Sequence, residues 1–298
     1  MALTYYSTTY QEDFPSRLDR WLRRRYPSLT QGVVQKALRD RFIRVNHAKS
    51  QASTSLQQGD VVSVEIHLHE RWIALSSSER STPPTPDFSS LILDETNDLL
   101  IINKPSGLDV QGGTKVQVHL DAWLKRTYPD ARLVHRIDKA TSGLLCVAKN
   151  LRMAMLLTDL FRNRQVHKTY RAIVWGRLHP QKGRISEPIH DVDGRIPARP
   201  AQTEYRVIRK GSFWSDVELT PLTGRKHQLR IHMAGKGNPI LGDKKYDIEG
   251  KTLGLLPPKG VLFLHAHRLS FCDADGKVNS WVAPLPSHWP FSLHTGAP

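Results

Sequence analysis

The sequence predicts an α+β protein with a small N-terminal domain and a larger, strand-rich domain. Three observations support this prediction. Most apolar segments in the second part of the chain have the length and composition of strands, and fewer have helical spacing. Nine of the twelve residues 76–87 are Ser, Thr or Pro, a composition that cannot build a packed core. The chain also lacks the strand and helix alternation and the glycine fingerprint of dinucleotide-binding folds. We therefore expect domains at residues 1–75 and 90–298, joined by a linker at 76–89.

The N-terminal domain is expected to contain two helices followed by two strands. Apolar residues recur at helical spacing in residues 16–26, and Thr30 is a suitable cap for a second helix. Residues 41–46 (RFIRVN) then predict a short strand that ends in a turn. Apolar and polar residues alternate in residues 61–68 (VVSVEIHL), which predicts a second strand.

The charge of the chain points to an anionic partner. It carries 43 basic and 28 acidic residues, a net charge of +15. Nucleic acid is favoured over a membrane, because no apolar run approaches the roughly 18 residues needed to span a bilayer. Basic residues are most concentrated in residues 17–49, where they have few acidic neighbours, so a phosphate-binding surface is favoured over a solvated helix face. The candidate RNA contacts there are Arg17, Arg20, Arg23, Arg24 and Arg41.

The larger domain is expected to be strand-rich, with two helices. Strands are predicted for the apolar segments, and helices for two segments whose apolar residues recur with a period near 3.6. The predicted strands are residues 91–95, 99–103, 144–150, 170–175, 216–222 and 261–271, and the predicted helices are residues 118–129 and 151–166.

Two polar segments of this domain are candidates for chemistry. His135, Arg136 and Asp138 lie between apolar residues and the predicted strand 144–150, where polar side chains are costly unless paired. Spacing alone leaves Asp138 open as a turn carboxylate or a reactive one. In the second segment, Arg230 lies among apolar residues and requires a carboxylate partner. Asp138 is a candidate for that partner, and the pair would keep Asp138 ionised and oriented as a nucleophile.

Several segments, in the same order, resemble the RluA-type family of pseudouridine synthases, in particular its RluC-like branch. The chain resembles this family over residues 91–285, and residues 15–66 resemble the αL RNA-binding module of a small-subunit ribosomal protein. The segments that carry the resemblance are LIINKPSGLDVQGG (100–113), HRIDKATSGLLCVAK (135–149), VHKTYRAIVWG (166–176), TGRKHQLRIHMAGKGNPILGD (223–243) and FLHAHRLSF (263–271).

The resemblance implies a pseudouridine synthase fold, with a central mixed, mostly antiparallel sheet and an active-site cleft, preceded by the αL domain. It implies an isomerase that converts specific uridines of structured RNA to pseudouridine without a cofactor or metal. Large-subunit ribosomal RNA is the expected substrate, and transfer RNA is the alternative. We expect a cytoplasmic monomer.

The resemblance also assigns roles to residues of the larger domain. Asp138 matches the catalytic aspartate, which attacks either the uracil ring or the ribose of a flipped-out uridine. Tyr170 matches the tyrosine that stacks on the base and takes part in deprotonating C5. Arg230 matches the arginine that pairs with the aspartate, with Arg225 as the second choice. Arg136 matches an RNA contact. Weaker candidates for RNA or pocket contacts are Lys104, His135, Arg225 and His227.

Two other classes of function are open from the sequence. A metal-dependent hydrolase would use histidine pairs such as His67 with His69 and His265 with His267, each on one face if its segment is a strand. A non-catalytic RNA-binding protein would keep the fold without the chemistry. The presence of Asp138 together with its matching tyrosine and arginine favours the enzyme over this second alternative.

Overall fold

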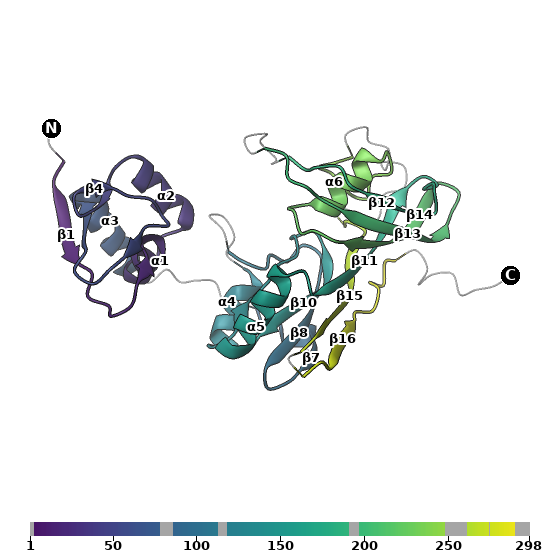
Figure 1. Cartoon of the computed structure of the whole chain (residues 1–298), viewed down its shortest axis with the longest axis horizontal. Coiled ribbons are helices and arrows are strands. Elements are labelled where there is room, and N and C mark those ends of the chain that lie inside the picture. Colours follow the sequence, from purple (N-terminus) through teal and green to yellow (C-terminus); the bar gives the residue numbers. More distant parts are fainter. Residues whose placement is uncertain are drawn as a thin grey trace. The chain divides into compact units, whose positions relative to one another are not determined.

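The computed structural model describes residues 3–77, 86–112, 118–190, 197–247, 261–273 and 275–289. These residues form two compact units, one made of residues 3–77 and one made of the rest (Figure 1). No helix within the described residues is long and apolar enough to cross a membrane.

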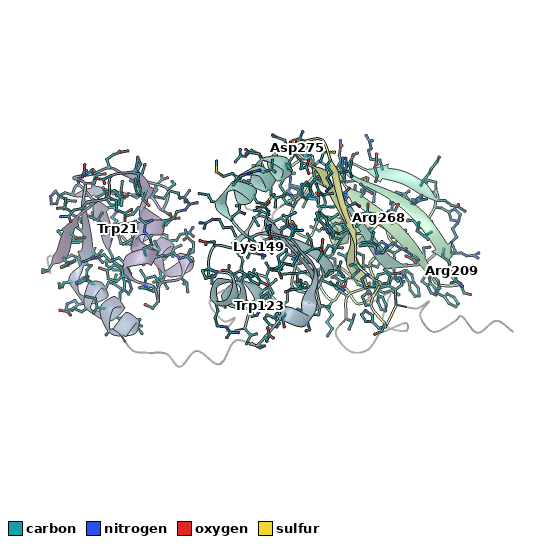
Figure 2. The ribbon with its side chains drawn as sticks, turned by 90° about the horizontal axis from the view of Figure 1, so that it is seen from below. Trp21, Trp123, Lys149, Arg209, Arg268 and Asp275 are labelled. Carbon is teal, nitrogen blue, oxygen red and sulfur yellow. The ribbon has the colours of Figure 1, made fainter. Side chains whose placement is uncertain are left out.

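The first unit packs three helices and a four-stranded antiparallel sheet around one core. The sheet has the order β1-β6-β3-β4, and the core contains the buried rings of Trp21, Tyr26 and Trp72, of which Figure 2 labels Trp21. Its elements are β1 (Tyr5–Thr9), β2 (Ser16–Arg17), α1 (Leu18–Arg25), α2 (Gln31–Arg39), β3 (Ile43–Val45), β4 (Ala48–Lys49), β5 (Ser55–Leu56), β6 (Val61–Glu65) and α3 (Ile66–Ser77).

The predicted helices and the first predicted strand of this unit are confirmed. The hydroxyl of Thr30 accepts a hydrogen bond from the backbone N–H of Val33, as a helix cap should. The second predicted strand is wrong beyond Glu65. The Glu65 carboxylate accepts hydrogen bonds from the backbone N–H groups of His67 and Leu68, so α3 begins where the alternating pattern continues. The pattern also missed strand β1, which pairs with β6.

The linker is shorter than the predicted residues 76–89, because ordered structure extends into it from both sides. Helix α3 continues through Ser77. At the other end, the Asp87 carboxylate accepts hydrogen bonds from the backbone N–H and hydroxyl of Ser89 and from the indole N–H of Trp123, which ties Asp87 to the second unit. Residues 78–85 lie outside the described residues.

The second unit is built on a ten-stranded mixed sheet. Its main order is β12-β13-β14-β11-β15-β10-β8-β7, with β16 paired to β15 and β9 paired to β10. Its elements are β7 (Ile92–Glu95), β8 (Leu99–Lys104), α4 (Leu120–Thr127), β9 (Arg132–Leu133), β10 (Ser142–Ala148), α5 (Leu151–Arg162), β11 (His167–Trp175), β12 (Lys182–Ile185), β13 (Thr203–Lys210), β14 (Trp214–Pro221), α6 (Gln228–Gly235), β15 (Leu264–Cys272) and β16 (Val278–Val282), with a short 3-10 turn at Ser89–Leu91.

All six predicted strands and both predicted helices of this unit are confirmed, and the α+β class holds. The pattern missed β13, whose residues TEYRVIRK are largely polar, and β16, which alternates between exposed and half-buried positions. It also left open whether the segment around Arg230 is extended or helical. The structure shows a helix there, α6.

The two halves of the large sheet meet where β10 and β15 run parallel, and the other pairs of this sheet are antiparallel. Gly143 makes this junction possible. Its φ of +104° favours glycine, and a Cβ at this position would lie 2.3 Å from the carbonyl oxygen of Ala266. Helices α4 and α5 lie beside the β10 half, and α6 lies beside the β13 half (Figure 1).

Candidate active site

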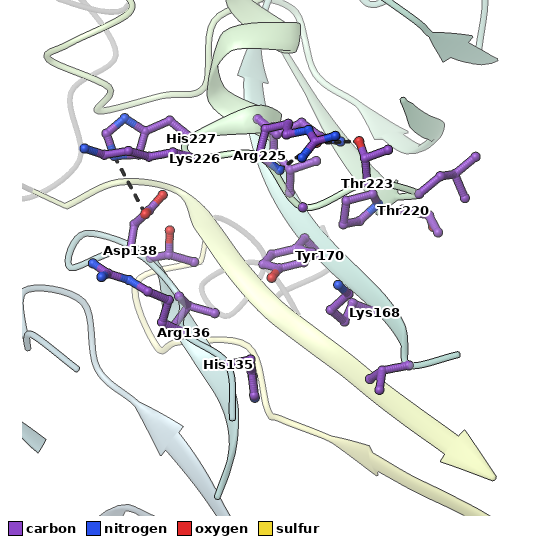
Figure 3. Close-up of a pocket in the computed structure, with 18 of the residues that line it drawn as sticks. His135, Arg136, Asp138, Lys168, Tyr170, Thr220, Thr223, Arg225, Lys226 and His227 are labelled. Atoms are coloured by element: carbon purple, nitrogen blue, oxygen red, sulfur yellow. Dashed lines mark hydrogen bonds and ion pairs between the residues drawn. The ribbon is translucent and has the colours of Figure 1, made fainter. Parts of the chain in front are cut away.

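A cavity of about 890 Å³ opens where these two halves meet. The loop before β10, the end of α5, strand β11 and the segment from β14 into α6 supply its walls (Figure 3). Asp138 is the one carboxylate among the described residues that line it, and cationic side chains surround it. These cations are Arg136, Arg162, Arg164, Lys168, Arg225, Lys226 and Arg230. A cavity with several cations and a single carboxylate suits a polyanionic ligand.

Asp138 lies in a tight turn directly before β10. Its backbone carbonyl accepts a hydrogen bond from the N–H of Thr141 at 3.0 Å, and its side chain is 27% exposed. The backbone therefore has the turn role that the spacing suggested. The carboxylate itself is free to face the cavity (Figure 3).

Lys104 lies behind this turn, hydrogen-bonded to the carbonyl oxygen of Lys139, and does not line the cavity. Its side chain is fully buried, and Nζ donates hydrogen bonds to the carbonyl oxygens of Pro105, Leu108 and Lys139. Burial lowers the pKa of Lys104 to about 8. The expectation that Lys104 contacts RNA phosphate is therefore wrong, because the ammonium group is enclosed by backbone.

His227 faces the carboxylate of Asp138. Its Nε2 lies 3.7 Å from Asp138 Oδ1, and its Nδ1 is hydrogen-bonded to the hydroxyl of Tyr246 at 2.8 Å (Figure 3). Burial lowers the pKa of His227, although the Asp138 charge opposes the shift. His227 also precedes α6 in the left-handed conformation, with φ of 55°, which turns its ring toward the cavity.

Arg230 has a different partner from the one expected. Its guanidinium forms two hydrogen bonds to Asp243, from Nε at 2.7 Å and from Nη2 at 2.6 Å, and both side chains are buried. Asp243 in turn accepts hydrogen bonds from the backbone N–H groups of Lys245 and Tyr246. The expected direct pair between Arg230 and Asp138 is therefore absent here. The Asp138 charge does contribute to raising the Arg230 pKa, after the larger contribution of Asp243, so the two groups share one electrostatic environment.

Tyr170 projects from β11 into the cavity near Asp138 (Figure 3). Burial, together with the Asp138 charge, raises the pKa of the phenol well above its usual value. The phenol is therefore neutral at physiological pH, and its ring is available for stacking.

His135 has a structural role that the sequence did not suggest. Its Nε2 accepts a hydrogen bond from the backbone N–H of Cys146 at 2.8 Å, and its ring stacks on Phe161 with centroids 4.5 Å apart. Burial and the nearby Lys168 charge lower the His135 pKa to about 3. His135 is thus a neutral ring that joins the Asp138 loop to β10, and it also lines the cavity, so its predicted RNA contact stays a prediction.

The remaining predicted contacts of this unit lie at the cavity. Arg136 is exposed, and Arg225 is half-buried, with its Nε donating to the carbonyl oxygen of Pro200. The sequence missed Lys168, which lines the cavity, and Asp243 and Tyr246, which bond to the lining residues Arg230 and His227. Asp243 and Lys168 lie within segments that carry the family resemblance, but spacing gave them no specific role.

The five arginines of the first unit that were predicted to contact RNA differ in whether they are already paired. Arg17 is paired with Asp19 at 2.9 Å, and Arg24 is paired with Glu12 at 2.6 Å, although few acidic neighbours were expected. The other three have exposed side chains and no ion-pair partner among the described residues. These three are Arg20, Arg23 and Arg41.

The histidine pairs do not form a metal site. His67 and His69 lie on helix α3, so they do not share a strand face, and His69 stacks on Tyr6 with centroids 3.6 Å apart. His265 is hydrogen-bonded to Ser142, and His267 to the carbonyl oxygen of Ala283. Within the described part of the chain, no group of three metal-ligating side chains occurs.

Comparison with known proteins identifies the family. A family model described as RNA pseudouridylate synthase matches residues 98–235. The chain is 36% identical to ribosomal large subunit pseudouridine synthase C of Rickettsia bellii (strain RML369-C), covering 94% of this chain and 98% of that protein. It is 33% identical to the protein of the same name from Vibrio cholerae serotype O1 (strain ATCC 39315 / El Tor Inaba N16961), covering 91% and 90%.

Solved structures agree with this relationship. Human RNA pseudouridylate synthase domain containing 4 matches with a TM-score of 0.58 and 32% identity, covering 67% of this chain and 90% of that chain. Human RNA pseudouridylate synthase domain containing 1 matches with a TM-score of 0.57 and 28% identity, covering 66% and 86%. The chain therefore belongs to the RluA family of RNA pseudouridine synthases and is RluC-like.

Proposed function

We propose that this pseudouridine synthase acts on specific uridines of large-subunit ribosomal RNA, with Asp138 as its nucleophile. The substrate class follows the relatives that match along almost their whole length, which are named ribosomal large subunit pseudouridine synthase C. The observation that supports the residue assignment is the position of Asp138, the single carboxylate lining a cationic cavity within the described residues.

The reaction begins with a uridine that leaves its stack and enters the cavity. Exposed cations at the rim, such as Arg136 and Lys226, hold the flanking phosphates. The ring of Tyr170 packs against the uracil, and Asp138 lies beside the reacting nucleoside. His227 Nε2 lies 3.7 Å from Asp138 Oδ1, so its ring is beside the attacking carboxylate, and burial lowers the pKa of His227.

The chemistry is an isomerisation, so atoms and electrons balance without an outside reactant. The bond between uracil N1 and ribose C1′ breaks, the uracil turns within the pocket, and C5 forms a bond to C1′. The proton on C5 leaves, and N1 gains one. The protein must therefore hold the detached uracil in place, which the enclosing walls of the cavity favour.

Arg230 is proposed to act through position. Its bidentate pair with Asp243 fixes the start of α6, and α6 carries His227 at its N-terminal end. The reacting groups named here all come from one chain, and we propose a monomer as the active form. Light scattering of the purified protein with and without RNA tests that part.

The function is tested by mapping pseudouridine in unmodified ribosomal and transfer RNA after incubation with the purified protein. New pseudouridines at discrete large-subunit positions are expected, and Asp138→Ala should abolish them while leaving RNA affinity nearly unchanged. Product on transfer RNA alone would reject the proposed substrate. RNA binding without product on any RNA would favour a non-catalytic RNA-binding protein.

A further inference from the structure

Lys168 is a cation in the wall of the active-site cavity that has no anionic partner. It precedes Tyr170 by two residues on β11, and both side chains line the cavity (Figure 3). Its Nζ lies 5.6 Å from the centroid of the Phe161 ring. Within the described residues, no carboxylate or carbonyl oxygen forms an ion pair or hydrogen bond with this ammonium group.

An unpaired cation in this position costs folding free energy. Burial lowers the pKa of Lys168, which means that the folded protein holds the charged form less readily than water does. Asp138, the carboxylate of the same cavity, has its ion-pair contact with His227 and forms none with Lys168. A charge kept in such an environment interacts strongly with any negative charge that develops nearby, because the local dielectric constant is low.

Two anions reach this cavity during the reaction, namely the RNA phosphates and the detached uracil. The phosphates are bulky and strongly hydrated, and three exposed cations without an ion-pair partner among the described residues are available to them. These are Arg136, Arg164 and Lys226. Lys168 is less exposed than these three, and it lies two residues before the tyrosine that packs against the base. Its position therefore matches the uracil better than a phosphate.

We propose that Lys168 is a further catalytic residue, whose ammonium group contacts the uracil and stabilises the negative charge that forms on it. The step follows attack of Asp138 on the ribose: a bond forms between the carboxylate and C1′ while the bond between N1 and C1′ breaks, and its electron pair stays on N1 and is delocalised onto O2 and O4. Lys168 donates a hydrogen bond to one of these oxygens and keeps its proton. The charge is consumed when C5 bonds to C1′ and displaces the Asp138 carboxylate, after which C5 loses its proton and N1 gains one. This inference rests on the proposed function of the same site.

The test compares Lys168→Met and Lys168→Arg with the wild type in single-turnover reactions, with enzyme in excess over a synthetic RNA that contains the target uridine. Methionine keeps the length of the side chain and removes the charge. At saturating enzyme, Lys168→Met should slow the reaction by about 10²-fold, the usual effect of removing one preorganised charge donor. Lys168→Arg should retain about a tenth of the rate or more, because it restores the charge in a different shape. The RNA Kd should change by less than about threefold in both, because the charge that Lys168 stabilises forms only during the reaction and is absent from the bound ground state.

Lys182→Met is the matched control, since it removes an exposed lysine from strand β12 of the same sheet. It should leave the rate and the Kd unchanged. Lys168→Met should also unfold at a urea concentration at least as high as the wild type does, because it removes a desolvated charge. A slow but equally stable Lys168→Met variant thus separates catalysis from folding.

The proposal fails if Lys168→Met keeps the wild-type rate at saturation while its Kd rises and the slope of log Kd against log salt changes by about one, the result expected of a phosphate contact. It also fails if Lys168→Met and Lys168→Arg are equally slow, since charge would then not matter. A wild-type protein that forms no pseudouridine would reject the proposed function itself, which is a different outcome.

Discussion

Arg230 and Asp243 form a buried, bidentate ion pair, with hydrogen bonds of 2.7 and 2.6 Å. The pair fixes the N-terminal part of α6 against the residues that follow Asp243, because Asp243 also accepts hydrogen bonds from the backbone N–H groups of Lys245 and Tyr246. Tyr246 then bonds to His227, which faces Asp138. A chain of contacts thus links Arg230 to the candidate nucleophile without a direct pair between them.

Asp243→Asn should destabilise the protein and slow the reaction. The substitution leaves a buried guanidinium without its counter-charge, a change that costs about 3–5 kcal/mol. Urea unfolding measures the free energy. Glu204→Gln is the control, since it breaks an exposed pair with Arg184 and should cost about 0–1 kcal/mol. An equal decrease in the free energy of unfolding of the two variants would show that the buried pair stabilises the protein no more than the exposed one.

Lys104→Met should affect the turn that holds Asp138. The ammonium group satisfies three partly buried carbonyl oxygens, and leaving such acceptors unpaired costs at most about 1–3 kcal/mol each, with incomplete additivity. We expect lower stability in urea and a slower reaction, with RNA affinity retained. Lys125→Met, which removes an exposed lysine paired with Asp121, should change neither. Full activity of Lys104→Met would contradict a supporting role for this lysine.

Stability should fall in mild acid partly because of His265. Burial lowers its pKa from 6.5 to about 4, so the unfolded chain binds a proton more readily than the folded protein does. Its contribution is complete above pH 6.5 and is lost as the pH falls toward 4, by at most roughly 3 kcal/mol. Urea unfolding at pH 7 and pH 5 measures this difference. His265→Asn, which can keep the hydrogen bond to Ser142, should show a smaller difference between the two pH values.

RNA binding should depend on the arginines of the first unit according to whether they are already paired. Arg20→Gln, Arg23→Gln and Arg41→Gln should each raise the Kd and lower the slope of log Kd against log salt by about one, because each phosphate contact releases counterions. Arg17→Gln and Arg24→Gln should have smaller effects, because their charges are engaged by Asp19 and Glu12. Filter binding at several salt concentrations measures both quantities. Identical effects for all five would contradict the distinction.

The sequence predicted those parts of the fold whose patterns are local. The buried strand β10 and the amphipathic helix α5 follow directly from apolar composition and spacing. The second helix of the first unit follows from Thr30 and the apolar residues after it. Strands β1 and β13 were missed because polar residues interrupt their patterns, and tertiary pairing decides their structure.

The candidate site was predictable where a motif names the residue, as for Asp138 and Tyr170. The ion-pair partner of a site residue was not predictable, because the fold decides which distant residue lies next to it. Arg230 needs a buried carboxylate, but the chain contains 28 acidic residues, and only the three-dimensional path brings Asp243 to it. Lys168 gave no signal either, since a lysine in a polar position of a strand ordinarily faces solvent.

Strand β15 lies between β11 and β10 in the sheet, although it is the next-to-last strand along the chain. Its His265 contacts Ser142, 123 residues earlier. During synthesis, the Asp138 half and the Tyr170 half therefore leave the ribosome before the strand that joins them exists. A nascent chain that ends before Leu264 carries every candidate reacting group and has no joined sheet to hold them together. Pseudouridine synthesis is thus one of the last properties that the growing chain acquires.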